Sequence, residues 1–468
     1  MTRIAILGGG PAGYEAALVA VQLGAEVTVV DRDGAGGACV LFDCVPSKAL
    51  IATSDAVTAF RGAPELGMRA HPGEEVVVDV TTMNARIKAL AAKQSADIRA
   101  RLERDGVRWV EGSGRFAETQ PAGARGLDVL DRDGAVIERL EADVVLIGAG
   151  ATPRELAGSP PDGERILSWR QLYDLTELPE HLVVVGSGVT GAEFASGFSE
   201  LGVPVTLVSS RDRVLPGEDV DAADVIERVF TAGGGTLVKQ ARAAKARRTA
   251  GGVEVDLLSG DVVRGSHALI CVGSVPATDD LGLRHVGADV GERGYIVVDR
   301  VSRTTAPGIY AAGDCTGLLL LASVAAMQGR IAMWHALGEA VTPLRLKTVA
   351  ANVFTHPEIA TVGVSATAVA SGQVPARSVM LALATNARAK MQEQTEGFVK
   401  IFCRPATGVI VGGVIVAQQA SELILPIALA VQRGLTVTEL ANTFSVYPSL
   451  SGSITEAARR LMTHDDLD

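Results

Sequence analysis

Residues 4–33 are IAILGGGPAGYEAALVAVQLGAEVTVVDRD, and residues 182–212 are LVVVGSGVTGAEFASGFSELGVPVTLVSSRD. Each stretch begins with a short apolar run, continues through G-x-G-x-x-G into a helical pattern, and ends with a second apolar run. The three glycines of the first stretch return in the second, always 178 positions later. The chain therefore contains an internal repeat of one strand–loop–helix–strand unit.

The glycine spacing predicts that each unit binds a dinucleotide. The first glycine allows a tight turn, the second lets a pyrophosphate approach the backbone, and the third lets the helix pack on the strand. The phosphates then lie at the helix N-terminus, where unpaired N–H groups and the helix dipole favour anions. The residues expected at the first site are Gly8, Gly10, Pro11, Ala12 and Gly13, and those expected at the second are Gly186, Gly188, Val189, Thr190 and Gly191.

The residue that ends the second strand of each unit predicts how the adenosine ribose is held. Asp31 ends this strand in the first unit, and its carboxylate would accept hydrogen bonds from ribose hydroxyls. Ser209 stands at the equivalent position in the second unit, followed by Ser210 and Arg211. Because no acid would repel a 2′-phosphate there, the second site is expected to accept NADPH as well as NADH. Arg211 equally fits a solvated loop charge.

Length and composition limit the possible classes of function. A chain of 468 residues predicts two or three domains, and a formal net charge of -11 with no basic run excludes a nucleic-acid-binding surface. The longest apolar run, around residues 318–327, is shorter than the roughly 20 residues of a membrane span, so no integral membrane segment is expected. An apolar strand at the start in place of a signal peptide, and an odd number of cysteines, predict a cytoplasmic location.

The fold class predicted is α/β, with two Rossmann-like domains, one inserted in the other, and an α+β domain at the C-terminus. Apolar runs at 144–147 and 268–272, each followed by glycine, are expected to be strands that leave and re-enter the first domain. Strands are also expected at 397–402 and 409–416, and a capping box at 453–456 is expected to begin a last helix through residue 462. The predicted domains are 1–150 with 272–346, 151–271, and 347–468.

Cys39 and Cys44 lie close together in the stretch GGACVLFDCVPSK, residues 36–48. Cysteines five positions apart can lie one helical turn apart with their sulfurs within bonding range. A helix N-terminus favours the thiolate and lowers a cysteine pKa from about 8.5 toward roughly 3.5 to 7.5. The pair is therefore a candidate reducible disulfide, and the alternative is two reduced cysteines packed in a helix. The remaining three cysteines are expected in the core: Cys271, Cys315 and Cys403.

With these motifs the chain resembles the pyridine nucleotide-disulfide oxidoreductases over essentially its whole length. The cysteine stretch is similar to the family signature G-G-x-C-x-x-x-G-C-x-P followed by Ser-Lys, with Asp43 where the family has glycine. The sequence YAAGD at 310–314 is similar to the second FAD motif of the family. FTHPE at 354–358 is similar to the start of its dimer-interface domain. No pattern predicts a metal site.

The resemblance implies a homodimer that binds FAD in the first domain and NAD(P)H in the second. It implies that hydride passes from the nicotinamide to the flavin and, where the disulfide works, onward to Cys44 beside the flavin and Cys39 as the interchange thiol. Lys48 should lie at the flavin and pair with Glu193 of the NAD(P) site. The other residues expected at FAD are Asp31, Arg32, Gly37, Ala38, Gly114 at the adenine, Gly148, Gly313, Asp314 at the ribityl chain and Ala322, and Gly273 is expected at NAD(P).

One part of the family pattern is missing near the C-terminus. Members that reduce disulfides carry H-P-x-x-x-E there, and the histidine is the base for the dithiol. This chain has YPSLSG at 447–452, so Tyr447 and Gly452 replace the dyad. Tyrosine, with an ordinary pKa near 10, cannot collect a proton near pH 7 as imidazole can, and the loss should lower dithiol turnover on the order of 10²- to 10⁴-fold. Gln328 also stands where an acid is usual.

These features predict an FAD-dependent NAD(P)H oxidoreductase with a quinone-type acceptor. The C-terminal pattern resembles the actinobacterial NAD(P)H-quinone reductase branch that is often named dihydrolipoamide dehydrogenase. Tyr447 could donate a hydrogen bond to a quinone or stack on it, and it equally fits an interface tyrosine without substrate contact. Two alternatives are a disulfide or dithiol reductase that uses Cys39 and Cys44, and a flavin-bound redox sensor with negligible turnover.

Overall fold

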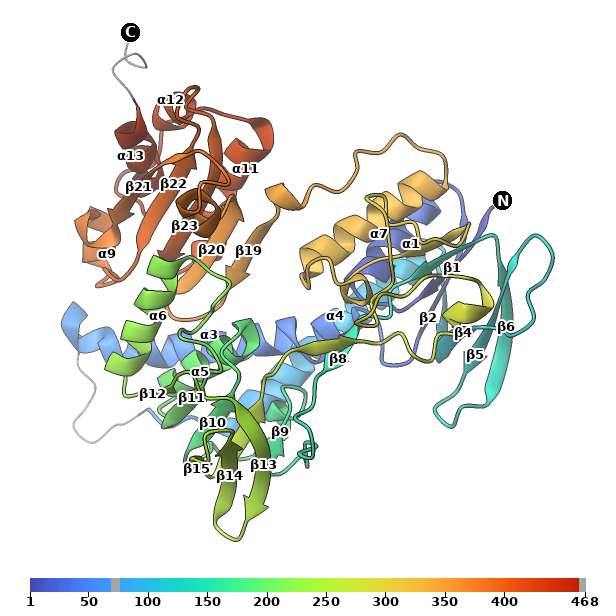
Figure 1. Ribbon diagram of the computed structural model, residues 1–468, viewed down its shortest axis with the longest axis horizontal. Coiled ribbons are helices and arrows are strands. Elements are labelled where there is room, and N and C mark those ends of the chain that lie inside the picture. Colours follow the sequence, from blue (N-terminus) through green and yellow to red (C-terminus); the bar gives the residue numbers. More distant parts are fainter. Residues whose placement is uncertain (69–75, 463–468) are drawn as a thin grey trace. The chain divides into compact units, whose positions relative to one another are not determined.

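The chain forms two compact units, each assembled from three separate stretches, in a computed structural model that describes residues 1–68 and 76–462 (Figure 1). The first unit comprises Met1–Ala49, Asn84–Arg154 and Gly273–Arg345. The second comprises Leu50–Met83, Glu155–Val272 and Leu346–Asp468. The α/β class is confirmed, whereas the three domain boundaries expected from the sequence stay a prediction.

A five-stranded parallel sheet, ordered β18-β7-β1-β2-β3, forms the core of the first unit. Its central strands are almost wholly apolar because a parallel sheet is covered on both faces. Helices α1 and α7 lie side by side (Figure 1) and bury small side chains against it. The bounds are β1 Arg3–Leu7, α1 Pro11–Gln22, β2 Glu26–Asp31, α2 Gly37–Leu41, β3 Arg108–Glu111, β7 Val144–Ile147, β18 Ile309–Ala311 and α7 Ala322–Ala336. Two further helices, α3 Cys44–Gly62 and α4 Val80–Arg104, belong to this unit only outside Leu50–Met83, which is part of the second unit.

Two smaller antiparallel sheets complete the first unit. A three-stranded sheet, β4-β5-β6, follows β3, and a two-stranded ribbon pairs β8 with β17. The ribbon lies where the chain leaves the unit and where it returns. The bounds are β4 Ser113–Phe116, β5 Arg125–Leu130, β6 Val136–Ala142, β8 Ala151–Pro153 and β17 Ser274–Pro276.

The second unit repeats the parallel sheet of the first. Its order, β12-β11-β10-β16-β9, matches the first sheet strand for strand, with β10 and β11 in the places of β1 and β2. The sequence repeat therefore extends to sheet topology, and both strands expected from glycine-terminated apolar runs are confirmed as β7 and β16. The bounds are β9 Ile166–Leu167, β10 Leu182–Val185, α5 Val189–Glu200, β11 Val205–Val208, α6 Val220–Ala232, β12 Thr236–Val238, β13 Ala243–Thr249, β14 Gly252–Leu257, β15 Val262–Gly265 and β16 His267–Ile270.

The C-terminal part of the second unit is an antiparallel sheet, ordered β19-β20-β23-β22-β21, with helices packed on it. The two strands expected at 397–402 and 409–416 are confirmed as β22 and β23, each shifted by one residue. The bounds are β19 Ala350–Val353, β20 Glu358–Gly363, α8 Ala366–Ala370, β21 Arg377–Ala382, α9 Ala387–Met391, β22 Phe398–Cys403, β23 Ile410–Ala417, α10 Ala420–Leu423, α11 Leu425–Arg433, α12 Val437–Ala441 and α13 Gly452–Leu461.

The capping box expected at residues 453–456 is wrong. Helix α13 already begins at Gly452, and its N-cap residue, Ser451, makes no side-chain capping bond. The hydroxyl of Ser453 is buried and accepts a hydrogen bond from Asn386 at 2.7 Å. A capping box does occur at α12, between Thr436 and Glu439. The pattern alone could not show that the Ser453 side chain bonds Asn386, the N-cap residue of α9.

A buried ion pair joins β22 to the N-terminus of α6 within the second unit. The ammonium of Lys400 lies 2.7 Å from both carboxylate oxygens of Asp219 and 2.6 Å from Asp221. The Lys400 and Asp219 side chains are only 8% and 2% exposed. Asp219 also caps α6 by accepting bonds from two backbone N–H groups. Removal of the lysine would therefore leave a buried carboxylate without its counterion.

Lys400→Met is expected to destabilise the protein by about 3–5 kcal/mol, because a buried charge that loses its partner keeps the cost of its desolvation. Arg228→Ala, which breaks the exposed Arg228–Glu396 pair between the same two regions, is the matched control and should cost about 1 kcal/mol or less. Urea unfolding followed by tryptophan fluorescence measures both. Equal, small losses of stability for the two variants would contradict this assignment.

One stretch, Gly37–Leu66, which contains α2 and α3, is long and apolar enough to cross a membrane by length and composition, among the residues that the structure describes. The expectation that no segment would reach this length is therefore corrected; 39% of the most apolar window is buried inside the protein. The run was missed because scattered polar residues interrupt it in the sequence.

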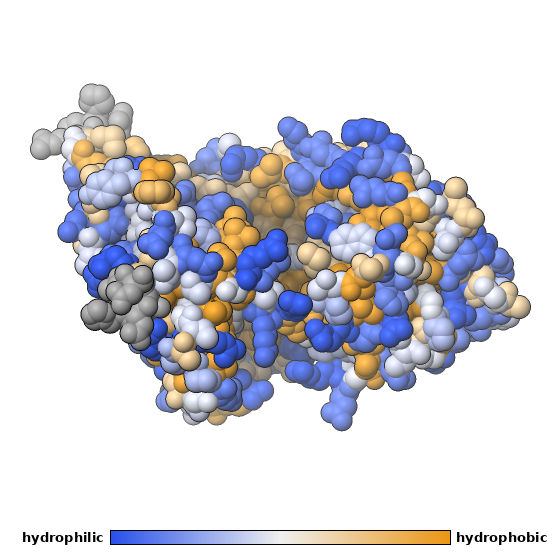
Figure 2. Space-filling view, turned by 90° about the horizontal axis from the view of Figure 1, so that it is seen from above, coloured by the Kyte–Doolittle hydropathy of each residue, from blue (hydrophilic) through white to orange (hydrophobic). Residues whose placement is uncertain are grey.

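Figure 2 shows one face of the molecule, on which hydrophilic and hydrophobic residues are interspersed. The three cysteines expected in the core are buried: Cys271, Cys315 and Cys403.

Candidate active site

The first glycine loop joins β1 to α1. On the side that faces the protein, it has no space for a side chain. A Cβ added to Gly13 would overlap the carbonyl oxygen of Gly8, and one added to Gly8 would overlap that of Gly148. Gly8 also has a φ of +107°, which favours glycine. Above Gly10, the N-cap of α1, an added Cβ would meet nothing within 4 Å. The loop is therefore open only at the helix N-terminus, and this cradle fits the pyrophosphate of FAD.

Asp31 ends β2 beside this loop and is held by backbone groups. Its Oδ2 accepts a hydrogen bond from Gly9 at 2.7 Å, and its Oδ1 accepts bonds from Asp33 and Gly34, each at 2.8 Å. Burial raises the pKa of Asp31, while the three N–H donors act in the opposite direction. A carboxylate has about four lone-pair sites, so one remains for a ribose hydroxyl. The geometry suits the role predicted for this residue.

Trp109, on β3, lies against the same loop and was not among the residues predicted from the sequence. A Cβ added to Gly9 would overlap the indole ring. The guanidinium of Arg99 lies 5.3 Å from the ring centroid, and the indole N–H is buried with no hydrogen-bond partner among the described atoms. The second glycine loop has Ser187 at the position of Gly9. The middle glycine of GGG, Gly9, was the available signal, because a side chain there would meet this tryptophan.

Gly9→Ala is expected to weaken FAD binding by roughly 10- to 100-fold, because the new methyl group forces the ring or the loop to move. Trp109→Val removes the obstacle and should restore most of the affinity when it is combined with Gly9→Ala. The recovery of flavin fluorescence on dissociation measures both constants, with Trp109→Val alone as the control. Equal FAD affinity of the single Gly9→Ala protein and the double variant would show that the ring is not the obstacle.

The second glycine loop, between β10 and α5, has the same construction. A Cβ on Gly191 would overlap the carbonyl oxygen of Gly186, and one on Gly186 would overlap that of Cys271. Gly186 has a φ of +111°. Over Gly188, the N-cap of α5, nothing lies within 4 Å of an added Cβ. Val189 and Thr190 form the first turn of the helix, so all five predicted residues lie together and fit a second pyrophosphate.

Ser209 takes the structural place of Asp31 in this second loop. It is buried, its hydroxyl lies 2.7 Å from that of Ser187, and it accepts a hydrogen bond from the backbone of Arg211 at 3.1 Å. Ser210 and Arg211 are exposed. The serine therefore shapes the turn, whereas the two residues after it present their side chains to the solvent, where a 2′-phosphate could be bound.

The two candidate redox cysteines span a break between two helices. Cys39 lies in α2, which ends at Leu41, and Cys44 is the first residue of α3. Phe42 and Asp43 form a turn between the helices. The proposed disulfide between the two cysteines stays a prediction. Both thiols are free and half-buried in this structure. Pro46 lies in the first turn of α3, as expected.

Neighbouring charges influence this pair in opposite directions. A hydrogen bond from Cys44 lowers the pKa of Cys39, and the same bond together with burial raises the pKa of Cys44. The carboxylate of Asp43 raises both pKa values, and the ammonium of Lys48 lowers both. The effect expected of Asp43, opposition to thiolate formation, has the predicted direction.

Asp314 and Gly313 follow β18 at the end of the first sheet. Burial, together with the nearby Asp43, raises the pKa of Asp314 to about 6. Gly313, with a φ of +82°, donates its backbone N–H to the side-chain oxygen of Gln328 at 2.9 Å. Gln328 is completely buried and also bonds Thr316. The residue that replaces the usual acid therefore fixes the loop that carries Asp314.

The remaining residues predicted at FAD lie around the first loop. Gly37 begins α2, and a Cβ on it would lie 2.9 Å from the Cα of Gly10. Gly114, on β4, allows that strand to lie over Leu7, because a Cβ there would overlap the leucine side chain. Arg32 is half-exposed after β2. The others occupy the start of α2, the end of β7 and the start of α7: Ala38, Gly148 and Ala322.

Glu193 and Gly273 complete the residues predicted at NAD(P). Glu193 lies one turn into α5, is buried, and accepts a hydrogen bond from the backbone of Phe354 at 2.9 Å. Gly273 follows β16 with a φ of +103°. The pairing of Glu193 with Lys48 stays a prediction. The bond to Phe354 ties the FTHPE segment to α5, a contact that the motif alone did not reveal.

The segment around Tyr447 contains no replacement for the missing base among the described residues. Tyr447 is 86% exposed, and its neighbours Phe444 and Val446 are also exposed. The contacts among the side chains of residues 445–455 join hydroxyl groups, with one amide, Asn386, bound to Ser449 and Ser453. These groups are neutral at pH 7 and cannot take up a proton as imidazole does.

Comparison with known proteins agrees with this geometry. Residues 2–329 match the family model for pyridine nucleotide-disulphide oxidoreductases, and residues 349–458 match the dimerisation domain of the same family. The chain is 61% identical to the NAD(P)H dehydrogenase (quinone) of Mycobacterium tuberculosis, over 100% of this chain and 95% of that protein. It is 32% identical to the dihydrolipoyl dehydrogenase of Bacillus subtilis, over 97% of each.

Solved structures give the same result. The crystal structure of LpdA from Mycobacterium tuberculosis superposes with a TM-score of 0.94 at 59% identity, over 99% of this chain and 100% of that one. The HOCl-induced flavoprotein disulfide reductase of Escherichia coli superposes with a TM-score of 0.85 at 24% identity, over 98% and 99% of the two chains, and shows the fold alone.

Proposed function

Because the chain belongs to the pyridine nucleotide-disulphide oxidoreductase family, whose members use FAD with NAD(P)H, we propose that it oxidises NAD(P)H and reduces a quinone-type acceptor. The observation that carries the proposal is that the side-chain contacts of residues 445–455, where a dithiol substrate would need a base, join only hydroxyl groups and the amide of Asn386. The name of the 61% identical relative supports the same acceptor.

The residues of the chain bind and orient two dinucleotides. Bound FAD supplies a group that accepts hydride from NAD(P)H and passes electrons to a second molecule. The loops at Gly10 and Gly188 hold the two pyrophosphates at helix N-termini, and Asp31 orients the FAD ribose. Reduction of a quinone would need neither the missing dyad nor thiol interchange by Cys39 and Cys44. The exposed ring and hydroxyl of Tyr447 are suited to contact a quinone.

Steady-state oxidation of NADPH with 1,4-naphthoquinone, compared with lipoamide, tests the proposal. Naphthoquinone should accelerate NADPH oxidation over the rate without acceptor, and lipoamide should give a rate lower on the order of 10²-fold or more. The Cys39→Ser, Cys44→Ser double variant should keep its naphthoquinone rate. A rate with lipoamide equal to that with naphthoquinone, or loss of the quinone rate with the cysteines, would overturn the proposal.

A second candidate function, disulfide or dithiol reduction, is favoured by one observation: the Cys39 and Cys44 thiols are hydrogen-bonded to each other, and Lys48 favours their ionisation. Anaerobic titration with NADPH separates the two functions. Uptake of four electrons per FAD would show that the cysteine pair is part of the electron path, and uptake of two would show that it is not.

Arg211→Ala is expected to raise the KM for NADPH by roughly 10- to 100-fold and to leave that for NADH within about twofold, because a guanidinium bound to a phosphate contributes about 1.5–3 kcal/mol. The exposed Arg211 follows the Ser209 turn, where the ribose is expected. Arg228→Ala, far along α6, is the control. An equal rise in both KM values would show that Arg211 acts on the loop and not on the phosphate.

The matched dimerisation domain supports a homodimer, and the exposed stretch that contains Phe444, Val446 and Tyr447 fits a surface that the second copy covers. We further place the protein in the cytoplasm, where its five cysteines would be kept reduced. Gel filtration with light scattering and fractionation of cells test these two assignments.

A further inference from the structure

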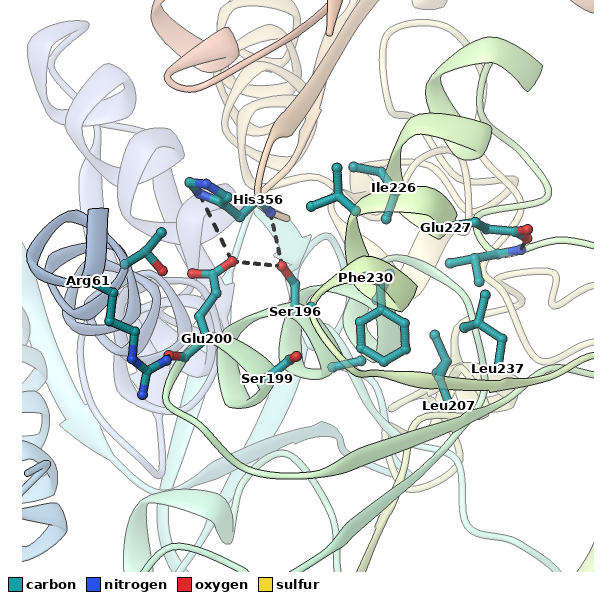
Figure 3. Close-up of a pocket in the computed structure, with 16 residues that line it drawn as sticks. Arg61, Ser196, Ser199, Glu200, Leu207, Ile226, Glu227, Phe230, Leu237 and His356 are labelled. Atoms are coloured by element: carbon teal, nitrogen blue, oxygen red, sulfur yellow. Dashed lines mark hydrogen bonds and ion pairs between the residues drawn. The ribbon is translucent and has the colours of Figure 1, made fainter. Parts of the chain in front are cut away.

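Three side chains from distant parts of the sequence meet within the second unit. Asp55 lies on α3, Glu200 ends α5, and His356 belongs to the FTHPE segment before β20. The imidazole Nδ1 of His356 lies 3.6 Å from the carboxylate of Asp55 and 4.0 Å from that of Glu200. The three candidate ligand atoms all lie within 4.8 Å of one another. This spacing is close enough for the three side chains to bind a single metal ion. Figure 3 shows His356 and Glu200 facing each other.

The cluster carries more negative than positive charge. Two carboxylates share at most one imidazolium, and neither forms an ion pair with lysine or arginine among residues 1–68 and 76–462. The nearest guanidinium, Arg61, donates to the backbone carbonyl of Glu200 and not to its carboxylate. The Glu200 side chain is only 14% exposed. Burial raises the pKa of Glu200, whereas Asp55 is 41% exposed, so a cation would stabilise the charged form of the buried Glu200 carboxylate.

The backbone and one hydroxyl hold the three side chains in place. Ser196, one turn before Glu200, donates its hydroxyl to Glu200 Oε1 at 3.1 Å and accepts the backbone N–H of His356 at 2.9 Å (Figure 3). Groups of this kind, which bond the ligands of a metal, fix ligand orientation in metal sites. The same serine therefore sets the positions of two of the three candidate ligands.

A cavity of about 230 Å³ opens beside the cluster (Figure 3). His356, Glu200 and Ser196 line it on one side, Glu227 lies on the other, and much of the wall between them is apolar, with Phe230 and Leu207 among its residues (Figure 3). A cation bound by the three side chains would therefore have protein ligands on one side and a cavity on the other. Metal sites with three protein ligands and an open position hold a water or a small ligand in the fourth.

We propose that Asp55, Glu200 and His356 bind one divalent transition-metal ion, with zinc as the best match, and that its open coordination position faces this cavity. Imidazole with carboxylates suits zinc, which forms bonds of about 2.0–2.2 Å and would separate neighbouring ligand atoms by roughly 3.4 Å. The ligand atoms, which lie within 4.8 Å of one another, would have to approach by up to about 1.4 Å. Within the second unit the site lies at the last residue of α5, whereas the glycine loop precedes the first, and the proposal does not depend on the choice of electron acceptor.

Zinc titration by calorimetry tests the site in the FAD-loaded Cys39→Ser, Cys44→Ser protein, so that thiolates cannot bind the metal. One zinc per chain is expected. His356→Ala and Asp55→Asn should each weaken binding at least about tenfold. Glu65→Gln, which removes an exposed carboxylate of the same unit, should leave it unchanged. Flavin absorbance near 450 nm verifies that each variant is folded.

Zinc-edge anomalous diffraction from a soaked crystal gives the position. A peak between Asp55, Glu200 and His356, lost in Asp55→Asn, is the expected result. Asp55 is 41% exposed, so Asp55→Asn is expected to fold. This variant therefore tests the metal site even if His356→Ala fails to fold. No peak there, a peak elsewhere only, or equal affinity in all variants would overturn the proposal and leave a simple ion pair between His356 and the carboxylates.

Discussion

The double variant Tyr447→His, Gly452→Glu is expected to turn over dihydrolipoamide about 10²- to 10⁴-fold faster than the natural chain, the range that a positioned general base contributes. The two changes recreate H-P-x-x-x-E at 447–452. NADPH oxidation with 1,4-naphthoquinone should persist, because neither residue belongs to the glycine loops or to the cysteine pair, and any change in its rate reports the proposed contact of Tyr447 with the quinone. Steady-state assays with both substrates measure the exchange of acceptor preference.

The structure leaves room for both new side chains. Tyr447 is 86% exposed, so a smaller histidine meets no obstacle in the chain itself. Gly452 is the first residue of α13, and an added Cβ would meet only Ser449 and Ser445 hydroxyls at 3.7 and 3.8 Å. A glutamate in the first turn of a helix is also favoured by the helix dipole. The variant therefore tests the chemistry of the dyad without a change of fold.

Each single change separates the two parts of the dyad. Tyr447→His alone should recover part of the dithiol turnover, because the base is present but not oriented, and Gly452→Glu alone should recover none. The pH profile of the gained activity should follow an imidazole near pH 6.5. If the double variant gained no dithiol turnover while its FAD content stayed complete, the missing dyad would not be the reason for the acceptor preference. The Cys39–Cys44 pair would then be the part that fails, and Asp43→Gly would be the next change.

The repeated glycine units made most of the fold predictable from the sequence. A parallel strand covered on both faces is a short apolar run, and the glycine spacing after it predicts a tight turn into a helix. Both sheets accordingly have the expected strands and the same order. The break between Cys39 and Cys44 could not be predicted in this way, because five residues fit one helical turn as well as two helices joined by Phe42 and Asp43. The spacing of the two cysteines therefore does not predict the turn between the helices.

Contacts between distant segments explain the other omissions. Trp109 affects the first loop through Gly9, a residue 100 positions away in the sequence, and Gln328 supports Gly313 from the next helix. The cluster at His356 assembles from three elements that no spacing rule connects. A sequence reveals a site when its residues share one motif. Sites built by packing are visible only when the side chains are placed.

Gly13→Ala and Gly191→Ala are expected to remove different cofactors, although the two positions are equivalent in the repeat. A Cβ on either residue would overlap the carbonyl oxygen of the first glycine of its own loop, so the helix must move away from the strand. Gly13→Ala should therefore be purified largely without FAD. Gly191→Ala should keep FAD and its absorbance near 450 nm, while reduction of the flavin by NADPH slows by roughly 100-fold.

Stopped-flow reduction at several NADPH concentrations measures the second effect, and the loss should appear in the apparent dissociation constant for NADPH. Gly217→Ala is the control in the same unit, because an added Cβ there meets nothing within 4 Å and the backbone is not left-handed. Loss of FAD from the Gly191→Ala protein, or normal NADPH reduction in it, would contradict the assignment of one dinucleotide to each loop. The two variants together test the duplication. The same substitution in two equivalent loops must abolish FAD binding in one protein and weaken NADPH binding in the other.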